Sequence, residues 1–374
     1  MPLKKLVIFI FLSLCLHSMK AQNFWSRYWE SLTKEESNDG SPSFIVYPTL
    51  AFAPETSWEF GLSSLYLYYA KGNPENRLSE FNAFTFYTLE HQYGLWLDHA
   101  NYGDHDRYMF LGRLRYQSFP LFYHGVGKNT PADPLALVDA QYLLWKEHFL
   151  KQIQGYLYAG VYADLQSLSR SNFISQSDQG YPFPSGANGS FNLGLGLSAV
   201  YDDRHNVLNV RDGNFTELSF LRYSPFWGSE YNFTSLLVDS RFYRSTTSNQ
   251  VWANQLLGQF VNGNAPFHML SLMGGESMMR GYYYGRYRDQ NLLAFQSEYR
   301  ILPFSFSKRW GASFFMAAGQ VYPQWENLKL NDFKLAGGAG LRFLIFPQKD
   351  IYTRLDFAMT EEGPGFYFFI GEAF

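Results

Sequence analysis

From residue 44 onward, apolar and polar positions alternate along the chain with a period of two. Between Ile153 and Leu165 the odd positions are apolar or small, and most even positions are tyrosine or another polar residue. The alternating segments run to roughly ten residues, the length that a tilted strand needs to cross a bilayer. The pattern therefore predicts an all-β fold, a transmembrane antiparallel β-barrel with one face toward lipid and the other toward a wet lumen.

Sixteen segments of this kind can be counted. They predict strands at residues 44–52, 57–70, 82–90, 93–101, 106–118, 137–150, 153–165, 192–202, 214–224, 231–244, 250–261, 291–301, 310–322, 335–347, 350–359 and 366–374. An even number of antiparallel strands brings both termini to the periplasmic side. The longest connections then fall outside the cell, at 119–136, 166–191 and 262–290. Closure is expected because an open sheet edge in hydrocarbon leaves backbone groups unpaired.

Composition supports this prediction. Aromatic residues make up 20% of the chain, with 28 Tyr and 36 Phe, whereas charged residues make up 17%. Girdles of aromatic side chains at both membrane interfaces of a barrel account for such an excess. The mean hydropathy of −0.25 argues against a helical membrane protein, because a barrel places its apolar residues at alternate positions only.

The first 21 residues have the features of a secretory signal peptide. Lys4 and Lys5 form a charged region, residues 6–16 an apolar core, and Ala21 a plausible cleavage residue. The apolar run is too short to span a bilayer, so we expect the segment to be removed.

Cysteine use and charge exclude some functions. The only cysteine, Cys15, lies in the predicted signal peptide, and a lipoprotein role for it is disfavoured by the large leucine before it. The mature chain then has no disulfide and no thiolate metal site. Removal of residues 1–21 takes away three lysines and no acid, which moves the formal net charge from −3 to −6. This charge argues against nucleic acid as a partner.

Residues 22–43 form a short N-terminal segment before the barrel, which is assigned to residues 44–374. Four apolar or aromatic residues fall at helical spacing, namely Trp25, Tyr28, Trp29 and Leu32. The segment is predicted either as an amphipathic helix on the inner leaflet or at the barrel mouth, or as a frayed tail.

One connection carries a distinct motif. The segment from Gly274 to Tyr284 holds a single arginine, Arg280, among apolar and aromatic residues, followed by Gly281 and Tyr282. A guanidinium inside a lumen is costly unless a carboxylate binds it, and the glycine allows a turn that a side chain would forbid. The motif predicts a loop that folds inward and brings Arg280 to a buried acid. The alternative is an ordinary aromatic-rich loop whose arginine faces water.

Strand parity supplies two candidate acids. Glu298 shares the lumen-facing parity of its strand with Arg300, directly after the loop, and Asp356 is lumen-facing with Arg354 on the fifteenth strand. An alternative role for Glu298 is a lumen ion pair with Arg300 or Arg342.

The last predicted strand is aromatic on one face. Its members are Phe366, Phe368, Ile370 and Phe374, with Gly371 between the last two. This pattern resembles the C-terminal signal by which outer-membrane barrels are recognised for insertion.

The Arg280, Gly281 and Tyr282 loop, set between two amphipathic strands in the C-terminal third, resembles the inward-folded sixth extracellular loop of the BamA/TamA-like outer-membrane assembly superfamily (bacterial surface antigen domain). The strand count, residues 201–204 after the eighth strand and a seam glycine at Gly371 extend the resemblance over nearly the whole mature chain.

The resemblance implies that Glu298 receives Arg280. The family's second acid, on the next strand, falls at Ala317, so its role passes to Asp356.

The resemblance also implies an integral outer-membrane barrel that helps to insert or translocate proteins, or lipids, with a separate periplasmic or outer-membrane protein partner. The seam between the first strand, 44–52, and the last, 366–374, would open laterally. Residues 22–43 are too few for a periplasmic POTRA module, which needs its own core, so we expect a member without POTRA domains.

Two alternatives stay open. A passive diffusion channel would take its selectivity from lumen arginines, namely Arg107, Arg113, Arg115, Arg342 and Arg354. A structural subunit of a larger outer-membrane complex would use its exposed loops.

No catalytic role is expected, and neither a cofactor nor a metal. The sequence has no phosphate loop, nucleophile elbow or zinc signature, and no lipid-facing Ser and His pair of a phospholipase. Around one predicted turn lie possible metal ligands whose spacing fits no motif, namely Asp98, His99, Asp104, His105 and Asp106.

Overall fold

The computed structural model describes residues 41–53, 57–89, 91–118, 120–176, 180–204, 206–207, 209–347 and 350–374. The predicted signal peptide and the predicted helix after it lie outside the described residues. No helix within these ranges is long and apolar enough to cross a membrane.

The regular secondary structure of the described chain consists of strands and single 3₁₀ turns. The strands are β1 (Ser43–Ala53), β2 (Ser57–Tyr69), β3 (Leu78–Thr88), β4 (Tyr93–Tyr102), β5 (Tyr108–Ser118), β6 (Leu121–Tyr123), β7 (Ala136–Gln154), β8 (Leu157–Ser175), β9 (Ser190–Asp202), β10 (Gly213–Tyr223), β11 (Phe233–Thr247), β12 (Gln250–Gly263), β13 (Ser271–Met273), β14 (Tyr287–Asp289), β15 (Asn291–Ile301), β16 (Trp310–Tyr322), β17 (Lys334–Phe346), β18 (Ile351–Thr360) and β19 (Gly363–Ile370). Single 3₁₀ turns lie between them, at η1 (Ala70–Gly72), η2 (Asp104–Asp106), η3 (Pro225–Trp227), η4 (Phe267–Met269), η5 (Trp325–Asn327) and η6 (Leu330–Asp332).

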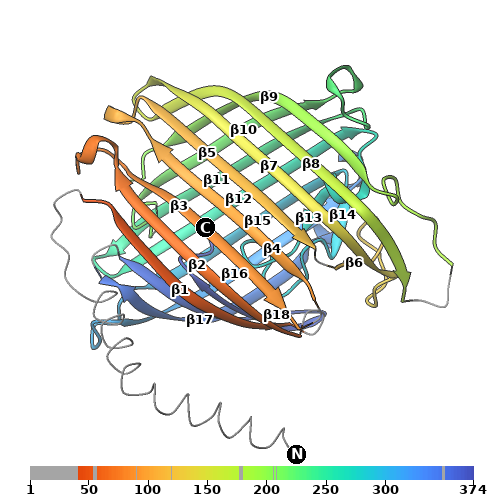
Figure 1. The fold of residues 1–374 in the computed structure, drawn as a ribbon. Coiled ribbons are helices and arrows are strands. Elements are labelled where there is room, and N and C mark those ends of the chain that lie inside the picture. The colour runs from red at the N-terminus through yellow and green to blue at the C-terminus, as the bar shows by residue number, and fades with distance from the viewer. Residues whose placement is uncertain are drawn as a thin grey trace, which may run out of the picture.

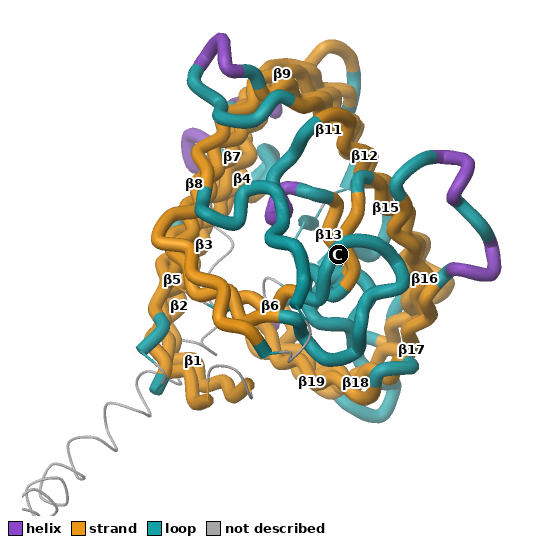
Figure 2. The backbone as a smooth tube through the Cα atoms, turned by 90° about the vertical axis from the view of Figure 1, so that its right-hand side faces the viewer, coloured by secondary structure: helices purple, strands orange, loops and turns teal. Residues whose placement is uncertain are grey.

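The long strands form one antiparallel sheet in chain order, from β1–β2 through to β18–β19 (Figure 1). Both β5 and the short β6 pair with β7, and β12 pairs directly with β15. Viewed end-on, the sheet curls into a ring (Figure 2). The two long strands with a single neighbour are β1 and β19, and no register joins them within the described residues.

The predicted strands and the observed ones agree in kind and differ in extent. Each of the sixteen predicted ranges overlaps a strand of at least eight residues, whereas β6, β13 and β14 have three residues each and were not predicted. The predicted connection 166–191 is too long, because β8 continues to Ser175 in register with β7. The predicted last strand, 366–374, is displaced, because β19 starts at Gly363 and ends at Ile370.

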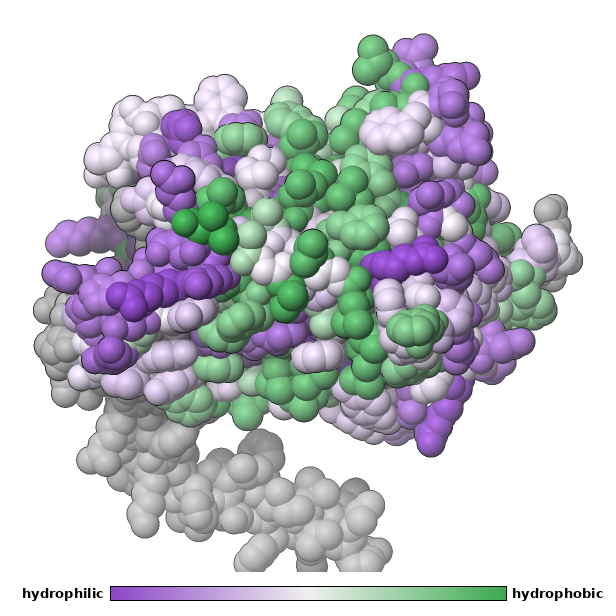
Figure 3. All heavy atoms as spheres, turned by 90° about the horizontal axis from the view of Figure 1, so that it is seen from above, coloured by the Kyte–Doolittle hydropathy of each residue, from purple (hydrophilic) through white to green (hydrophobic). Residues whose placement is uncertain are grey.

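The wall has apolar side chains outside and polar side chains inside. In β9, Leu195 and Leu197 are exposed, at 42% and 66%, whereas Ser198 is 3% exposed. Figure 3 shows the result on one side of the molecule, a band of hydrophobic residues flanked by hydrophilic residues at both ends. A soluble protein has the opposite arrangement, so this wall suits lipid outside and water or polar groups inside.

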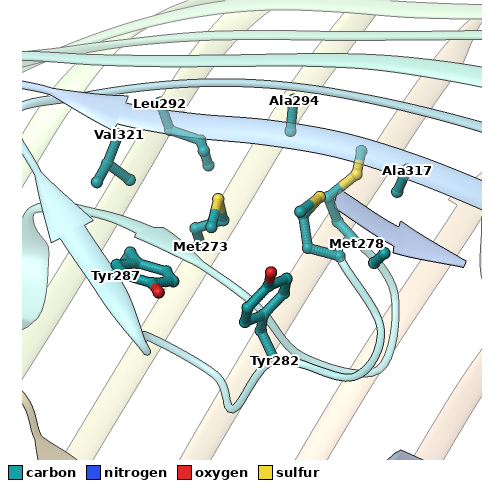
Figure 4. Packing of buried hydrophobic residues seen from close by; sticks show 10 residues of the cluster. Met273, Met278, Tyr282, Tyr287, Leu292, Ala294, Ala317 and Val321 are labelled. Atoms are coloured by element: carbon teal, nitrogen blue, oxygen red, sulfur yellow. The ribbon is translucent and has the colours of Figure 1, made fainter. Parts of the chain in front are cut away.

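Part of the interior is filled by the segment between β12 and β15, which includes β13 and β14 (Figure 2). Its apolar residues pack against β15, β16 and β17 in one buried cluster, made of Met273, Met278, Met279, Tyr282, Tyr287, Leu292, Ala294, Ala317, Val321 and Ala336 (Figure 4). We call the end of the ring that holds residues 264–270 the loop end and the opposite end the turn end.

Candidate functional site

The inward segment is a closed loop between two short paired strands. β13 pairs with β14, with Met273 opposite Tyr287. Between them, the Gly275 N–H donates to the Tyr282 carbonyl oxygen at 3.0 Å, and the Tyr282 N–H donates to the Met279 carbonyl oxygen at 3.2 Å. These bonds give the loop a defined tip, which carries Arg280.

Arg280 lies at the tip and is 1% exposed. Its Nη1 donates to Oδ2 of Asp356 at 2.6 Å, and its Nη2 donates to Oε2 of Glu298 at 2.5 Å. The guanidinium carbon is 3.5 Å from the ring centroid of Phe315 on β16, a cation–π contact. The loop therefore delivers its arginine to two acids from different strands, and Arg280 does not face water.

Three more arginines share these acids. Nε of Arg300 donates to Oε1 of Glu298 at 3.0 Å, and Arg342 contacts Glu298 at 3.2 Å and Asp356 at 2.6 Å. Nη1 of Arg354 donates to Oδ2 of Asp356 at 3.0 Å. Each carboxylate thus binds three guanidinium groups.

A third acid completes the cluster at the turn end. Glu372 accepts from Nε of Arg342 at 2.9 Å and lies 3.7 Å from Nε of Arg300. The cluster therefore has four guanidinium groups and three side-chain carboxylates, nearly all fully buried. Buried charges of this kind persist only when they are paired, so each acid is essential to the arginines around it.

Gly281 fixes the approach of the loop to the last two strands. Its φ is +106°, a conformation that side chains rarely adopt. A Cβ at this position would lie 2.5 Å from Cγ2 of Thr360, and the Gly281 N–H donates to the hydroxyl of Tyr367 on β19 at 2.8 Å. Glycine is required here for both backbone conformation and space.

The position where the resemblance places a second acid, Ala317, belongs to the apolar cluster beneath the loop. Its small side chain shares this cluster with Met278 and Met279 of the loop. Tyr282 fixes the same region, because its hydroxyl donates to the Leu335 carbonyl oxygen at 3.2 Å. Apolar packing replaces an acid on β16, and Asp356 on β18 supplies the second carboxylate.

The loop is also tied to the loop end of the ring. Nε of Arg286 donates to Oε2 of Glu362 at 2.7 Å, and its Nη1 donates to Oγ1 of Thr130 at 2.7 Å. The guanidinium of Arg288 lies over the rings of Tyr123 and Phe267, at 5.3 and 5.6 Å. The inward loop is therefore held at its tip by the arginine cluster and at its base by the 120–135 connection.

The chain turns inward after β19. Gly371 has a φ of +90°, and its N–H donates to the Tyr352 carbonyl oxygen at 2.8 Å. Phe374 is 8% exposed and packs against Tyr243, with ring centroids 6.2 Å apart. The prediction that Phe374 shares a face with Phe366, Phe368 and Ile370 is wrong, because the left-handed glycine breaks the alternation and sends Phe374 to the inside, while Phe366 and Phe368 are exposed at 71% and 61%.

The structure brings together Arg280, Gly281, Tyr282, Glu298 and Asp356 around the loop. Sequence reasoning missed Phe315, Tyr367 and Glu372. Phe315 lies two positions from Ala317, and Tyr367 lies two positions from Gly365, so the alternation of each strand could have identified both side chains as inward-facing. Glu372 comes after the last strand and after Gly371, so strand alternation could not have identified it.

Residues 201–204, also part of the resemblance, form a separate ion cluster at the turn end. Asp202 accepts from Nε of Arg204 at 2.8 Å and lies 3.1 Å from Nη1 of Arg77 after η1. It joins the turn after β9 to the turn after β2.

The possible metal ligands near residues 98–106 are separated. Asp98 faces the lumen beside Arg113 and Arg115, whereas Asp104 pairs with Lys71. In the part of the chain that the structure describes, no group of three or more His, Cys, Asp or Glu is arranged to hold a metal ion.

One histidine at the base of the loop predicts a pH effect on stability. His268 of η4 is 7% exposed, lies beside Tyr142 and Arg288, and its ring nitrogens have no hydrogen-bond partner among the described residues. Burial, followed by the positive charge of Arg288, lowers the pKa of His268 to about 3. The unfolded chain takes up this proton near its ordinary pKa of about 6.5, so stability is full above that pH and falls as the pH drops toward 3.

We expect the free energy of unfolding to fall by about 2–3 kcal/mol from this residue between pH 7 and pH 4.5. Urea unfolding of the vesicle-reconstituted protein at both pH values measures it. The control is His268→Phe, which keeps the ring and removes the titration, so it should lose this part of the pH dependence. An unchanged pH dependence in the variant would refute the assignment.

Comparison with known proteins agrees with this geometry. The family model of the Omp85 superfamily domain matches residues 145–374, more than half of the chain. The chain belongs to the Omp85 superfamily. A search of curated proteins gives no match.

Solved structures extend the likeness of this Omp85 chain to the N-terminal strands. It is similar to BamA from Haemophilus ducreyi lacking POTRA domains 1–3, with a TM-score of 0.53, 14% identity, and 90% of this chain and 70% of that chain covered. It is also similar to CdiB from Acinetobacter baumannii, with a TM-score of 0.53, 11% identity, and coverage of 91% and 66%. A third similar structure is CdiB from Escherichia coli, with a TM-score of 0.52, 11% identity, and 88% of this chain and 61% of that chain covered. At these identities the likeness is one of fold.

Proposed function

We propose that this protein is a sixteen-stranded outer-membrane barrel that assists the insertion or translocation of outer-membrane proteins, together with a separate periplasmic or outer-membrane protein. The observation that carries the proposal is the Arg280 loop, which is bound inside the ring to Glu298 and Asp356. We place the turn end of the ring toward the periplasm and the loop end toward the cell exterior.

The seam is the second part of the proposal. Within the described residues, β1 and β19 each pair on one side only, and the chain leaves the sheet at Gly371, which shortens the edge that β19 offers to β1. Short or irregular edges pair weakly, and an unpaired edge can template a further strand. We infer that the wall opens here and that the inward loop keeps the remaining strands in place.

A reversible lock tests the seam. Cysteine pairs scanned along β1 and β19 should abolish assembly of outer-membrane proteins in cells when oxidised and restore it on reduction, because the mature chain has no other cysteine. The readout is the fraction of folded, heat-modifiable outer-membrane protein in a strain that depends on this chain.

The matched control is a cysteine pair at Ser64 and Ala83, which are register partners on β2 and β3. This pair bonds two strands that the mechanism never separates, so activity should persist. Full activity with an oxidised seam would refute the proposed opening.

A further inference from the structure

The outward face of the wall carries a histidine–glutamate pair across β4, β5 and β7. Nε2 of His99 lies 3.2 Å from Oε2 of Glu147. In the register of these strands, His99 is opposite Gly112, and Gly112 is opposite Glu147. The pair therefore bridges over β5, between side chains that lie on strands two apart.

Gly112 makes this bridge possible. A Cβ at position 112 would overlap both Nε2 of His99 and Oε2 of Glu147. Any other residue would push the imidazole and the carboxylate apart. The glycine thus leaves space in which two polar groups meet on the outward face of the wall.

Two more residues extend the pair into a series of hydrogen-bonded side chains. The amide Nδ2 of Asn101 lies 2.9 Å from Nδ1 of His99, and the hydroxyl of Tyr68 donates to Oδ1 of Asn101 at 3.0 Å. Because Nδ2 is a donor, Nδ1 of His99 accepts, and Nε2 carries the proton that is donated to Glu147. Oε1 of Glu147 accepts no hydrogen bond from any described residue, so this carboxylate has a free acceptor.

The same strand carries a contrasting pair on its inner face. His148, the next residue, lies 3.1 Å from Glu217. That pair is enclosed, because Ser219 donates to Oε1 of Glu217 at 2.6 Å and Tyr162 stacks on His148 at 3.7 Å. Its side chains are 10% and 12% exposed, compared with 20% and 26% for His99 and Glu147. The outer pair is the accessible one.

Aromatic rings surround the outer pair near the turn end of the strands. Phe81 packs on His99, with ring centroids 5.4 Å apart, and Tyr108 stacks on Phe149 at 5.9 Å. Phe110 lies 4.9 Å from Phe149. A belt of aromatic side chains marks the level at which a barrel meets the head-group layer.

We propose that this outer cluster, made of Tyr68, His99, Asn101 and Glu147, binds the primary ammonium head group of a phospholipid in the periplasmic leaflet. The free oxygen of Glu147 accepts a charge-assisted hydrogen bond from the ammonium, and the ring of Phe81, which packs on His99, contacts the same cation. A trimethylammonium head group has no N–H and cannot make that bond. The proposal rests on the orientation proposed above, with the turn end toward the periplasm, and it is independent of the seam mechanism.

The test is competition between two zwitterionic lipids. The detergent-solubilised barrel is equilibrated with equal amounts of phosphatidylethanolamine and phosphatidylcholine of the same acyl chains, and retained lipid is identified by native mass spectrometry. The wild type should retain phosphatidylethanolamine with a preference of about tenfold, the ratio expected for one charge-assisted hydrogen bond. Glu147→Gln and Gly112→Ala should each abolish the preference.

The matched control is Glu217→Gln, which alters the enclosed inner pair and should keep the preference. Heat-modifiable migration identifies the folded fraction of each variant, and only folded protein is compared. The proposal is overturned if the wild type shows no preference between the two lipids, or if Glu217→Gln loses the preference as Glu147→Gln does. It is also overturned if the purified barrel retains a polypeptide in place of lipid.

Discussion

Glu298→Gln is expected to be the most destabilising single substitution in the interior, lowering the free energy of unfolding by about 3–5 kcal/mol. The carboxylate binds Arg280, Arg300 and Arg342, all fully buried. The amide keeps the shape and removes the charge, so two side-chain carboxylates remain for four guanidinium groups. Arg280→Met should cost less, because it leaves three arginines and three carboxylates.

The measurement is urea unfolding in lipid vesicles, checked by heat-modifiable migration. Glu361→Gln is the matched control, since Glu361 is bound to Lys334 at 55% side-chain exposure, where an ion pair contributes at most about 1 kcal/mol. Equal stability of the Glu298 and Glu361 variants would contradict a shared buried cluster.

Charge reversal is a poorer test of the same cluster. In the pair Arg280→Glu and Glu298→Arg, the new arginine would face Arg300 and Arg342, and the new glutamate would face Asp356. Each change therefore creates new like-charge contacts, and we expect the double variant to remain unstable. A simple pair can be exchanged, whereas a member of a network cannot.

The alternation of side chains was sufficient to predict the wall, because period two is a local property of each strand. It also identified Glu298 and Asp356 as inward-facing, and the glycine-bounded segment around Arg280 as a loop rather than a strand. Whether both acids reach Arg280 together depends on the register of β15 and β18 and on the position of the loop tip. These are set by contacts between residues far apart in sequence, which no local pattern encodes.

The errors have the same origin. The alternation rule placed Phe374 on the outer face. That rule holds only while the backbone stays extended, and Gly371 adopts a left-handed conformation. Glu372 was missed for this reason. The extra length of β8 was missed because its residues beyond Leu165 are mostly polar and do not alternate regularly with apolar ones, although they pair with β7 up to Ser175. A strand that continues past the apolar band has no apolar alternation to reveal it.

Gly281→Val is expected to displace the loop tip and to raise the ion conductance of single barrels in planar bilayers several-fold, with frequent transitions between levels. Valine is strained at a φ of +106°, and its Cβ would lie 2.5 Å from Cγ2 of Thr360, whose β-branched side chain has little freedom to move. The Gly281 bond to Tyr367 would be lost, and Arg280 would be drawn away from Asp356 and Glu298.

The control separates the effect of backbone strain from the effect of displacing the inward loop. Gly228 has a φ of +94° in the turn after η3, and a Cβ there would have nothing within 4 Å. Gly228→Val therefore carries a similar backbone cost outside the lumen, and its conductance should match the wild type. Equal conductance of the two variants would show that the loop does not limit the passage of ions. A wild type with a large and steady conductance would favour the diffusion channel, because a bound inward loop leaves a small or fluctuating path.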